Sequence, residues 1–225
     1  MLEIGSGAGR FTQILAQLDA QITVADISQG QLDLNHQFAD HLGFAKQIKA
    51  WQQLDICQME SLPTGEFDCV VAYGGPLSYV MEKRGDALAE CIRILKPGGF
   101  LLSSVISIWG TVHHSLPGVL AVPAQNNQAI TTTGDLTPEN ETSRSHSMHL
   151  FRSTEFRHFL ETHHLTILAL SASGCLGTNW QEILVDLRND EEKWGELLRM
   201  ELEASAETGC LDMGTHLIAV AQKPY

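Results

Sequence analysis

Three glycines at alternate positions form the motif with the clearest chemical meaning. Gly5, Gly7 and Gly9 follow a short apolar stretch, Leu2 to Ile4, and precede a segment with helical spacing. Glycine lets the backbone turn sharply and lets a ligand approach closely, and the N-terminus of the following helix offers free N–H groups. The pattern predicts a loop that binds a phosphate, a dinucleotide or the carboxylate of an amino acid.

The spacing of the glycines argues against two common nucleotide motifs. A dinucleotide fingerprint is G-x-G-x-x-G, and here the third glycine, Gly9, comes one position early. The sequence contains no G-x-x-x-x-G-K-[ST], which removes the P-loop interpretation. Glu3 lies two positions before the first glycine, and this carboxylate favours a cationic ligand over a pyrophosphate.

Titratable side chains that could act as a general base gather in the middle of the chain. Histidine is the usual base near neutral pH, and the candidates are His113, His114, His146 and His149. Tyr79 is a further candidate for contact with a substrate, although it fits a core position equally well. His146 and His149 have i, i+3 spacing, but no nearby Cys or Asp completes a metal site, so we expect no metal.

The elements that position these residues alternate between strands and helices. Apolar stretches at 2–4, 22–26, 67–73 and 100–108 have the composition of strands, and a weaker stretch lies at 48–55. The first intervening helix is expected to bury one face made of Phe11, Ile14, Leu15 and Leu18. Strands and helices in this order predict a doubly wound α/β sheet with right-handed crossovers.

Ligands of such sheets bind beyond the carboxyl ends of the strands. We therefore expect the 5–9 loop, Asp26, Asp55 and the 73–77 loop to share one rim. Asp26 ends the second expected strand, and Ser28 after it is the expected N-cap of a helix, with Gln31 three positions later.

The second half of the sequence is less regular. Residues 109–150 show little periodicity, which is typical of a lid, a binding loop or disorder. Ser153 is an expected N-cap, and the last strand is expected at 215–221. We predict one domain, 1–225, with a cofactor-binding half at 1–107 and substrate-side insertions at 108–152 and 173–214.

Composition narrows the class of partner. Lys and Arg number 14 against 27 Asp and Glu, a net charge of −13, which argues against nucleic-acid binding. No apolar run is long enough for a membrane span, and no secretory signal is present, so a cytoplasmic protein without a membrane partner is expected. The five cysteines include no C-x-x-C pair, and their odd number does not indicate a disulfide framework.

Leu2-Glu3-Ile4-Gly5-Ser6-Gly7-Ala8-Gly9 resembles motif I of the class I S-adenosylmethionine-dependent methyltransferases. Phe67-Asp68-Cys69-Val70 and Arg93-Ile94-Leu95-Lys96-Pro97-Gly98-Gly99 resemble two later motifs of that family in the right order. The resemblance covers residues 1 to about 107. It implies a Rossmann-like sheet of seven strands, mostly parallel with an antiparallel last strand, and S-adenosylmethionine as the cofactor.

The resemblance also implies roles for particular residues. Backbone amides of Gly5, Gly7 and Gly9 would meet the methionine part of the cofactor, and Glu3 would orient the loop or meet the amino group through water. Asp26 would accept both ribose hydroxyls, and Ile27 beside it belongs to the same contact set. Asp55 would accept from the adenine amine, Ile56 would pack on the ring or donate its amide, and the Tyr73 carbonyl would take the ammonium group.

The expected function is transfer of a methyl group to a small molecule by in-line displacement. Methyltransferases of exocyclic or amide nitrogens carry an N-P-P-Y type tetrad after strand four, and this chain has Tyr73-Gly74-Gly75-Pro76 there instead. One alternative is a non-catalytic or truncated methyltransferase fold that binds a ligand. A less favoured one is an NAD(P)-dependent oxidoreductase. Tyr79 and Lys83 have its Tyr-x-x-x-Lys spacing, but they directly follow strand four, where reductases of that kind do not place it.

Proteins of the resembled family usually carry one or two helices before motif I, whereas Met1 here falls inside the motif. We therefore expect that the chain starts at an internal methionine or is truncated. If the chain is complete, we expect an open cofactor site, which a homodimer could cover.

Overall fold

The computed structural model describes residues 1–141 and 146–225, and its centre is a seven-stranded sheet of order β3-β2-β1-β4-β5-β9-β8. Its strands are β1 (Leu2–Ile4), β2 (Ile22–Asp26), β3 (Ile48–Gln53), β4 (Phe67–Ala72), β5 (Leu95–Ile106), β8 (Thr166–Ser173) and β9 (His216–Gln222). The strands β1 to β5 pair in parallel, and β9 runs antiparallel to both β5 and β8. This confirms the doubly wound sheet with an antiparallel last strand.

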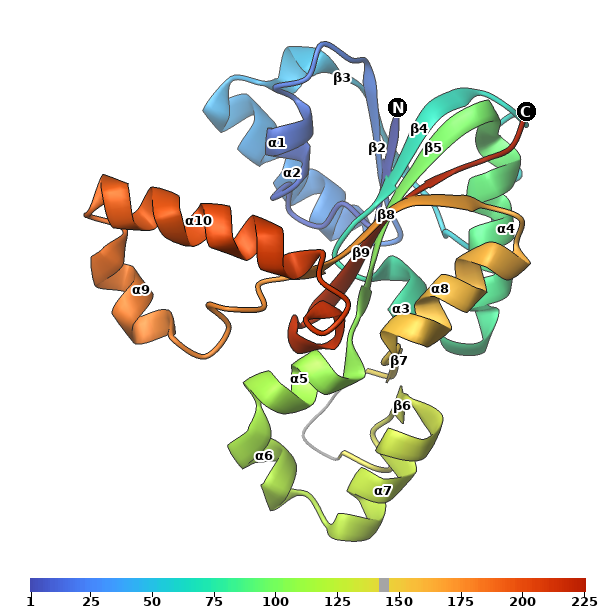
Figure 1. Ribbon diagram of the computed structural model, residues 1–225. Helices are drawn as coiled ribbons and strands as arrows, with labels where there is room; N and C mark the ends of the chain where they lie inside the picture. The colour runs from blue at the N-terminus through green and yellow to red at the C-terminus, as the bar shows by residue number, and fades with distance from the viewer. Residues whose placement is uncertain (142–145) are drawn as a thin grey trace.

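Helices cover both faces of the sheet. They are α1 (Thr12–Leu15), α2 (Gln29–Leu42), α3 (Pro76–Tyr79), α4 (Arg84–Ile94) and α8 (Ser153–Thr162), with 3-10 turns at Ala45–Gln47, Met81–Lys83 and Leu211–Met213. Figure 1 shows α1 and α2 on one side of the sheet and α4 and α8 on the other. The molecule therefore has three layers, with apolar side chains between each pair of layers.

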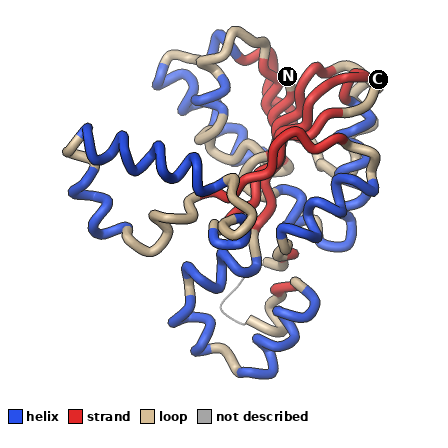
Figure 2. The backbone as a smooth tube through the Cα atoms, in the orientation of Figure 1, coloured by secondary structure: helices blue, strands red, loops and turns tan. Residues whose placement is uncertain are grey.

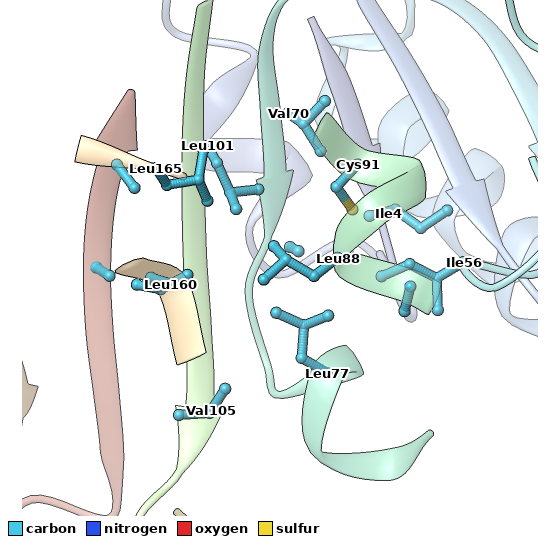
Figure 3. Packing of buried hydrophobic residues seen from close by; sticks show 14 of the residues in the cluster. Ile4, Ile56, Val70, Leu77, Leu88, Cys91, Leu101, Val105, Leu160 and Leu165 are labelled. Atoms are coloured by element: carbon cyan, nitrogen blue, oxygen red, sulfur yellow. The ribbon is translucent and has the colours of Figure 1, made fainter. Parts of the chain in front are cut away.

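The larger core lies between the sheet and the layer of α4 and α8. Figure 3 shows Leu88 and Cys91 of α4 packing toward Ile4 and Val70 of the sheet, with Leu77 of α3 below them. The smaller core lies under α1 and α2 and includes Leu15, Leu32 and Val24, among other residues. Both cores hold the strands rigidly, so the carboxyl ends of β1, β2 and β4 have fixed positions relative to one another.

Two helical groups extend beyond this edge of the sheet (Figure 2). One consists of α5 (Ile108–His114), α6 (Leu116–Ala121) and α7 (Ala124–Thr133), followed by the short strand pair β6 (Asp135–Leu136) and β7 (Met148–His149). The other consists of α9 (Gln181–Leu187) and α10 (Glu191–Ser205). No helix in the described part of the chain is both long and apolar enough to cross a membrane.

The expectation of an irregular segment at 109–150 is wrong for most of its length. Three short helices occur there, α5, α6 and α7, and of these α5 has a side-chain N-cap hydrogen bond, whereas α6 and α7 have none. Ser107 accepts from the Gly110 N–H at 3.2 Å, and the Asn127 amide donates to the Val119 carbonyl at 2.7 Å. The expected insertion 108–152 also contains residues 142–145, which lie outside the described residues.

The starts of α2 and α8 agree to different degrees with the N-caps expected from local sequence patterns. Ser28 is the N-cap of α2 as expected, and its hydroxyl accepts from the Gln31 N–H at 3.3 Å. Ser153 instead begins α8, and Arg152 takes the N-cap position. The expected buried face of the first helix is wrong, since α1 is one turn long and leaves Ile14 57% and Leu18 52% exposed.

Candidate cofactor and acceptor site

The glycine loop between β1 and α1 has a backbone that only glycine adopts easily. Gly5, Gly7 and Gly9 have φ angles of +70°, +53° and +104°. A Cβ atom at Gly5 would lie 2.5 Å from the Pro76 side chain, so the loop after β4 packs directly on the glycine loop. The two loops therefore form one continuous backbone surface at the carboxyl ends of β1 and β4.

Asp26 fastens the glycine loop to the end of β2. Its carboxylate accepts from the Gly7 N–H at 2.9 Å and from the Ser28 N–H at 2.9 Å, and the residue is 8% exposed. Each carboxylate oxygen has two lone pairs, so both oxygens keep acceptor capacity for hydroxyl groups of a ligand. The structure thus places Asp26 beside the loop, as the sequence predicted.

A buried polar network supports the loop from below. Thr12 donates to the Glu3 carboxylate at 2.7 Å and accepts from the Asn35 amide at 2.8 Å. Asn35 also donates to the Gly7 carbonyl at 3.3 Å and accepts from the Trp51 indole N–H at 3.1 Å. Burial, partly opposed by the Thr12 hydrogen bond, raises the pKa of Glu3 to about 7.

Of the residues expected to contact adenine, some have side chains that are accessible to a ligand and others do not. Ile27 follows Asp26 and is 64% exposed, so its side chain is free to cover a flat ligand. Asp55 lies just past β3 and accepts from the Cys57 N–H at 2.8 Å. The Ile56 side chain is 7% exposed and belongs to the larger core (Figure 3), which leaves only its amide, not its side chain, for the expected contact.

Tyr73 and Gly74 continue β4 on the other side of the loop. The Tyr73 ring packs edge-on against Phe11 at 5.4 Å between centroids, and burial raises the pKa of its phenol. The Gly74 N–H donates to the Ser104 hydroxyl of β5 at 2.9 Å. This bond fixes the backbone of residues 73 and 74, where the carbonyl of Tyr73 was expected to meet an ammonium group.

A cavity of about 860 Å³ opens beside Tyr73 and Gly74. Its floor is formed by β5 and β9, including Ser104, His216 and Ile218, and its other wall is formed by the helical pair α9 and α10. A volume of this size is typical of small-molecule sites. The cavity reaches the glycine loop through Arg10 and Phe11, so it adjoins the expected cofactor site.

Of the histidines predicted as bases, His114 is the one that lines the cavity. Its Nδ1 lies 3.3 Å from the Thr178 carbonyl. His113, one position earlier, is exposed, and its Nε2 lies 2.9 Å from the Asn179 amide nitrogen. These contacts tie the end of α5 to the segment before α9.

The other candidates lie away from this cavity. His149 is 2% exposed, and its two ring nitrogens each lie 2.7 Å from a carboxylate oxygen, one of Asp135 and one of Glu155. His146 packs against Tyr79 at 5.5 Å between ring centroids, and neither residue lines the cavity. His149 therefore holds α8 against the β6–β7 pair, and we do not retain it as a candidate base.

Several lining residues were missed in the sequence, among them Arg10, His216 and Arg188. Arg10 directly follows the glycine motif, and its position was the available signal. His216 begins β9, and burial together with the charge of Arg10 lowers its pKa, so its imidazole is neutral at neutral pH. Arg188 ends α9, and its guanidinium lies 5.3 Å from the centre of the Trp194 ring. No local pattern distinguishes these last two residues.

The site fits a cofactor that is cationic and carries a ribose. The positive φ angles of the loop keep side chains out of the approach path, and Asp26 offers acceptors next to it. The buried Glu3 carboxylate lies beneath the loop, where a positive charge on a ligand would stabilise its ionised form. The residues present therefore match S-adenosylmethionine better than a dinucleotide pyrophosphate.

Comparison with known proteins agrees with this geometry. A family model described as a methyltransferase domain matches residues 2–103. The ubiquinone/menaquinone biosynthesis C-methyltransferase UbiE of Pseudomonas fluorescens is 33% identical over 106 residues, which cover 45% of this chain and 40% of that protein. The similarity thus spans less than half the length of that relative.

Solved structures are similar over nearly the whole chain. A protein described as a SAM-dependent methyltransferase from Methanosarcina mazei superposes with a TM-score of 0.65 at 20% identity, covering 99% of this chain and 91% of that one. The [4+2]-cyclase SpnF gives a TM-score of 0.62 at 20% identity, covering 99% of this chain and 74% of that one. At this level of identity, the likeness establishes the fold of the second half but no reaction.

Proposed function

We propose that this chain is a class I S-adenosylmethionine-dependent methyltransferase that transfers a methyl group to a small-molecule acceptor. The observation that carries the proposal is the cavity of about 860 Å³, which joins the glycine loop to the wall formed by α9 and α10. It is large enough for a drug-sized molecule and adjoins the expected cofactor site. Residues of the 173–214 segment line this cavity, which supports the assignment of that segment as a substrate-side insertion.

The residues of the chain divide into two groups in this proposal. The glycine loop, Asp26 and the Tyr73 carbonyl hold and orient the cofactor, while the cavity holds the acceptor on the far side of Gly74. S-adenosylmethionine supplies a methyl group that is already activated as part of a sulfonium. The main contribution of the protein is alignment, since proximity and orientation lower a barrier by several kcal/mol.

A proton acceptor is needed only when the acceptor atom must lose a proton. His114 and His216 both line the cavity, and the lowered pKa of His216 keeps its imidazole unprotonated at neutral pH. His216 is the better placed of the two, because it begins β9 in the cavity floor rather than ending the exposed helix α5. We assign it as the first candidate base for an acceptor that loses a proton.

A second candidate function is ligand binding without methyl transfer. The same fold occurs in a protein named as a [4+2]-cyclase, that is, for a reaction other than methyl transfer. Fold alone therefore does not fix the reaction. Methyl turnover on any acceptor separates this possibility from the first.

Calorimetry tests the cofactor half of the proposal. We expect S-adenosylmethionine and S-adenosylhomocysteine to bind with micromolar affinity and NADH not to bind. Binding of NADH, or of none of the three, would contradict the proposal. Once binding is established, release of S-adenosylhomocysteine in the presence of candidate acceptors tests turnover.

A further inference from the structure

We infer that the acceptor cavity is built for an elongated molecule with an apolar body and an anionic group at the end far from the cofactor. The inference rests on the proposed function and names the class of acceptor. Three features carry it: the shape of the wall formed by α9 and α10, the charges that line the cavity, and the bonding of its one lining carboxylate.

The wall formed by α9 and α10 is long and apolar. Trp194, Leu197, Leu198 and Leu184 line the cavity from these helices. Leu198 is 50% exposed although it lies beside the cavity, so apolar surface is available there for a ligand. Trp194 and Glu201 are seven positions apart on α10, which corresponds to about 10 Å along the helix axis. The cavity lining thus extends along about 10 Å of α10, a length that suits an elongated acceptor.

The outer end of this wall is cationic. Arg188 lines the cavity there and lies over the face of Trp194, at 5.3 Å from the ring centre. Within the part of the chain that the structure describes, its guanidinium has no carboxylate partner. Stacking on Trp194 holds the guanidinium in place while its N–H groups stay available to an anion.

The one carboxylate in the lining is already satisfied. Glu201 accepts hydrogen bonds from the backbone N–H groups of Cys175, Leu176 and Gly177, two of them at 3.0 Å. These hydrogen bonds hold the loop before α9 against α10. Because the Glu201 carboxylate is engaged in them, it does not compete with a ligand for Arg188. The other acidic residues of α9 and α10 lie outside the lining.

A second arginine, Arg10, lies at the end of the cavity that adjoins the expected cofactor site. Arg10 lines the cavity beside the glycine loop, and its guanidinium lies 5.7 Å from the centre of the Phe11 ring. Arg188 lies at the connection between α9 and α10, which Figure 1 shows at the end of α10 away from the sheet. The two arginines therefore mark the two ends of the cavity, and Arg188 is the residue that selects an acidic acceptor.

Two fluorescent probes of matched shape test the inference. Anilinonaphthalene sulfonate is an apolar anion, and N-phenylnaphthylamine is the same ring system without the charge. Both are titrated into the full chain saturated with S-adenosylhomocysteine, and the ratio of their affinities is the readout. We expect Arg188→Gln to lower the preference for the anion about tenfold, because a charged hydrogen-bonding partner is lost. Arg188→Lys should restore most of the preference.

Arg157→Gln is the matched control, since Arg157 lies on the exposed side of α8 outside the cavity. An affinity ratio that Arg188→Gln leaves unchanged, or failure of both probes to bind, would overturn the inference. Loss of S-adenosylhomocysteine binding by the wild-type chain would instead overturn the proposed function, so the two failures are distinct. Displacement of the bound sulfonate probe by dodecanoate indicates a chain-like acceptor, and displacement by naphthoate indicates a ring-like one. If neither compound displaces the probe, an acidic acceptor is contradicted.

Discussion

The hydroxyl of Thr12 donates a 2.7 Å hydrogen bond to the Glu3 carboxylate across the glycine loop. The bond joins the strand before the loop to the helix after it, and Asn35 extends the connection to α2. The loop is therefore held on a polar network that is almost fully buried. Such networks are sensitive to the loss of any one partner, because the remaining groups lose their hydrogen bonds away from water.

Glu3→Gln should make the stability of the protein less dependent on pH. The pKa of Glu3 is raised from 4.5 to about 7 in the folded chain, so the folded state keeps a proton that the unfolded state releases. The free energy of unfolding therefore falls as the pH rises from about 4.5 to 7, by about 3 kcal/mol in total. The Gln variant lacks this fall. Its free energy of unfolding relative to wild type should therefore increase by about 3 kcal/mol between pH 4 and pH 8. Urea unfolding of both proteins at pH 4 and pH 8 measures this change. A difference in free energy of unfolding that is the same at both pH values contradicts the prediction.

Asp26→Ala should weaken binding of S-adenosylhomocysteine about tenfold to a hundredfold, because the hydrogen bonds of a charged acceptor are lost. The Gly7 and Ser28 N–H groups also lose their partner, so part of the effect comes from the loop itself. Calorimetry measures the change. Asp33→Ala removes the same charge from the exposed side of α2 and should leave affinity within twofold; an equal loss in both variants would assign the effect to net charge.

Gly5→Ala should destabilise the protein and abolish cofactor binding together. Its φ of +70° is unfavourable for alanine, and the new Cβ would meet Pro76 at 2.5 Å. We expect a loss of about 1–3 kcal/mol in the free energy of unfolding. Gly118→Ala in α6 is the control, since no atom lies within 4 Å of a Cβ there, and alanine favours a helix. Thermal unfolding compares the two, and equal stability contradicts the prediction.

Glu155→Gln should destabilise the chain near neutral pH but not in acid. Burial raises the pKa of Glu155, but the hydrogen bond and charge of His149 outweigh burial and hold the pKa below its ordinary value of 4.5. This carboxylate therefore stabilises the fold above pH 4.5, and the contribution is lost as the pH falls below it. Unfolding of wild type and variant at pH 7 and pH 3 checks the sign, and a difference that is larger in acid would refute it.

The alternation of strands and helices in the first half of the chain could be predicted because its signals are local and agree with one another. Ser28 and Gln31 marked the start of α2, and continuous apolar runs marked β2 and β4. The position of Asp26 then followed from parallel strands that end at one edge. Each of these inferences needs only residues that are close in the sequence.

Long-range contacts could not be predicted in this way. The helical spacing of Ile14 and Leu18 suggested a buried face, but α1 ends at Leu15 and both side chains are more than half exposed. His149 looked available for catalysis, yet Asp135 and Glu155 bind both of its ring nitrogens from two different elements. His216 and Arg188 enter the site only because β9 and α9 meet the sheet edge in space.

The order of the sheet also sets the order in which the protein can be completed during synthesis. The last strand made, β9, lies inside the sheet between β5 and β8 rather than at its edge. Strands β1 to β5 can pair as the chain emerges, whereas β8 has no neighbour until the final residues are free. The floor of the acceptor cavity belongs partly to β9, so a nascent chain can assemble its cofactor loop well before it can hold an acceptor.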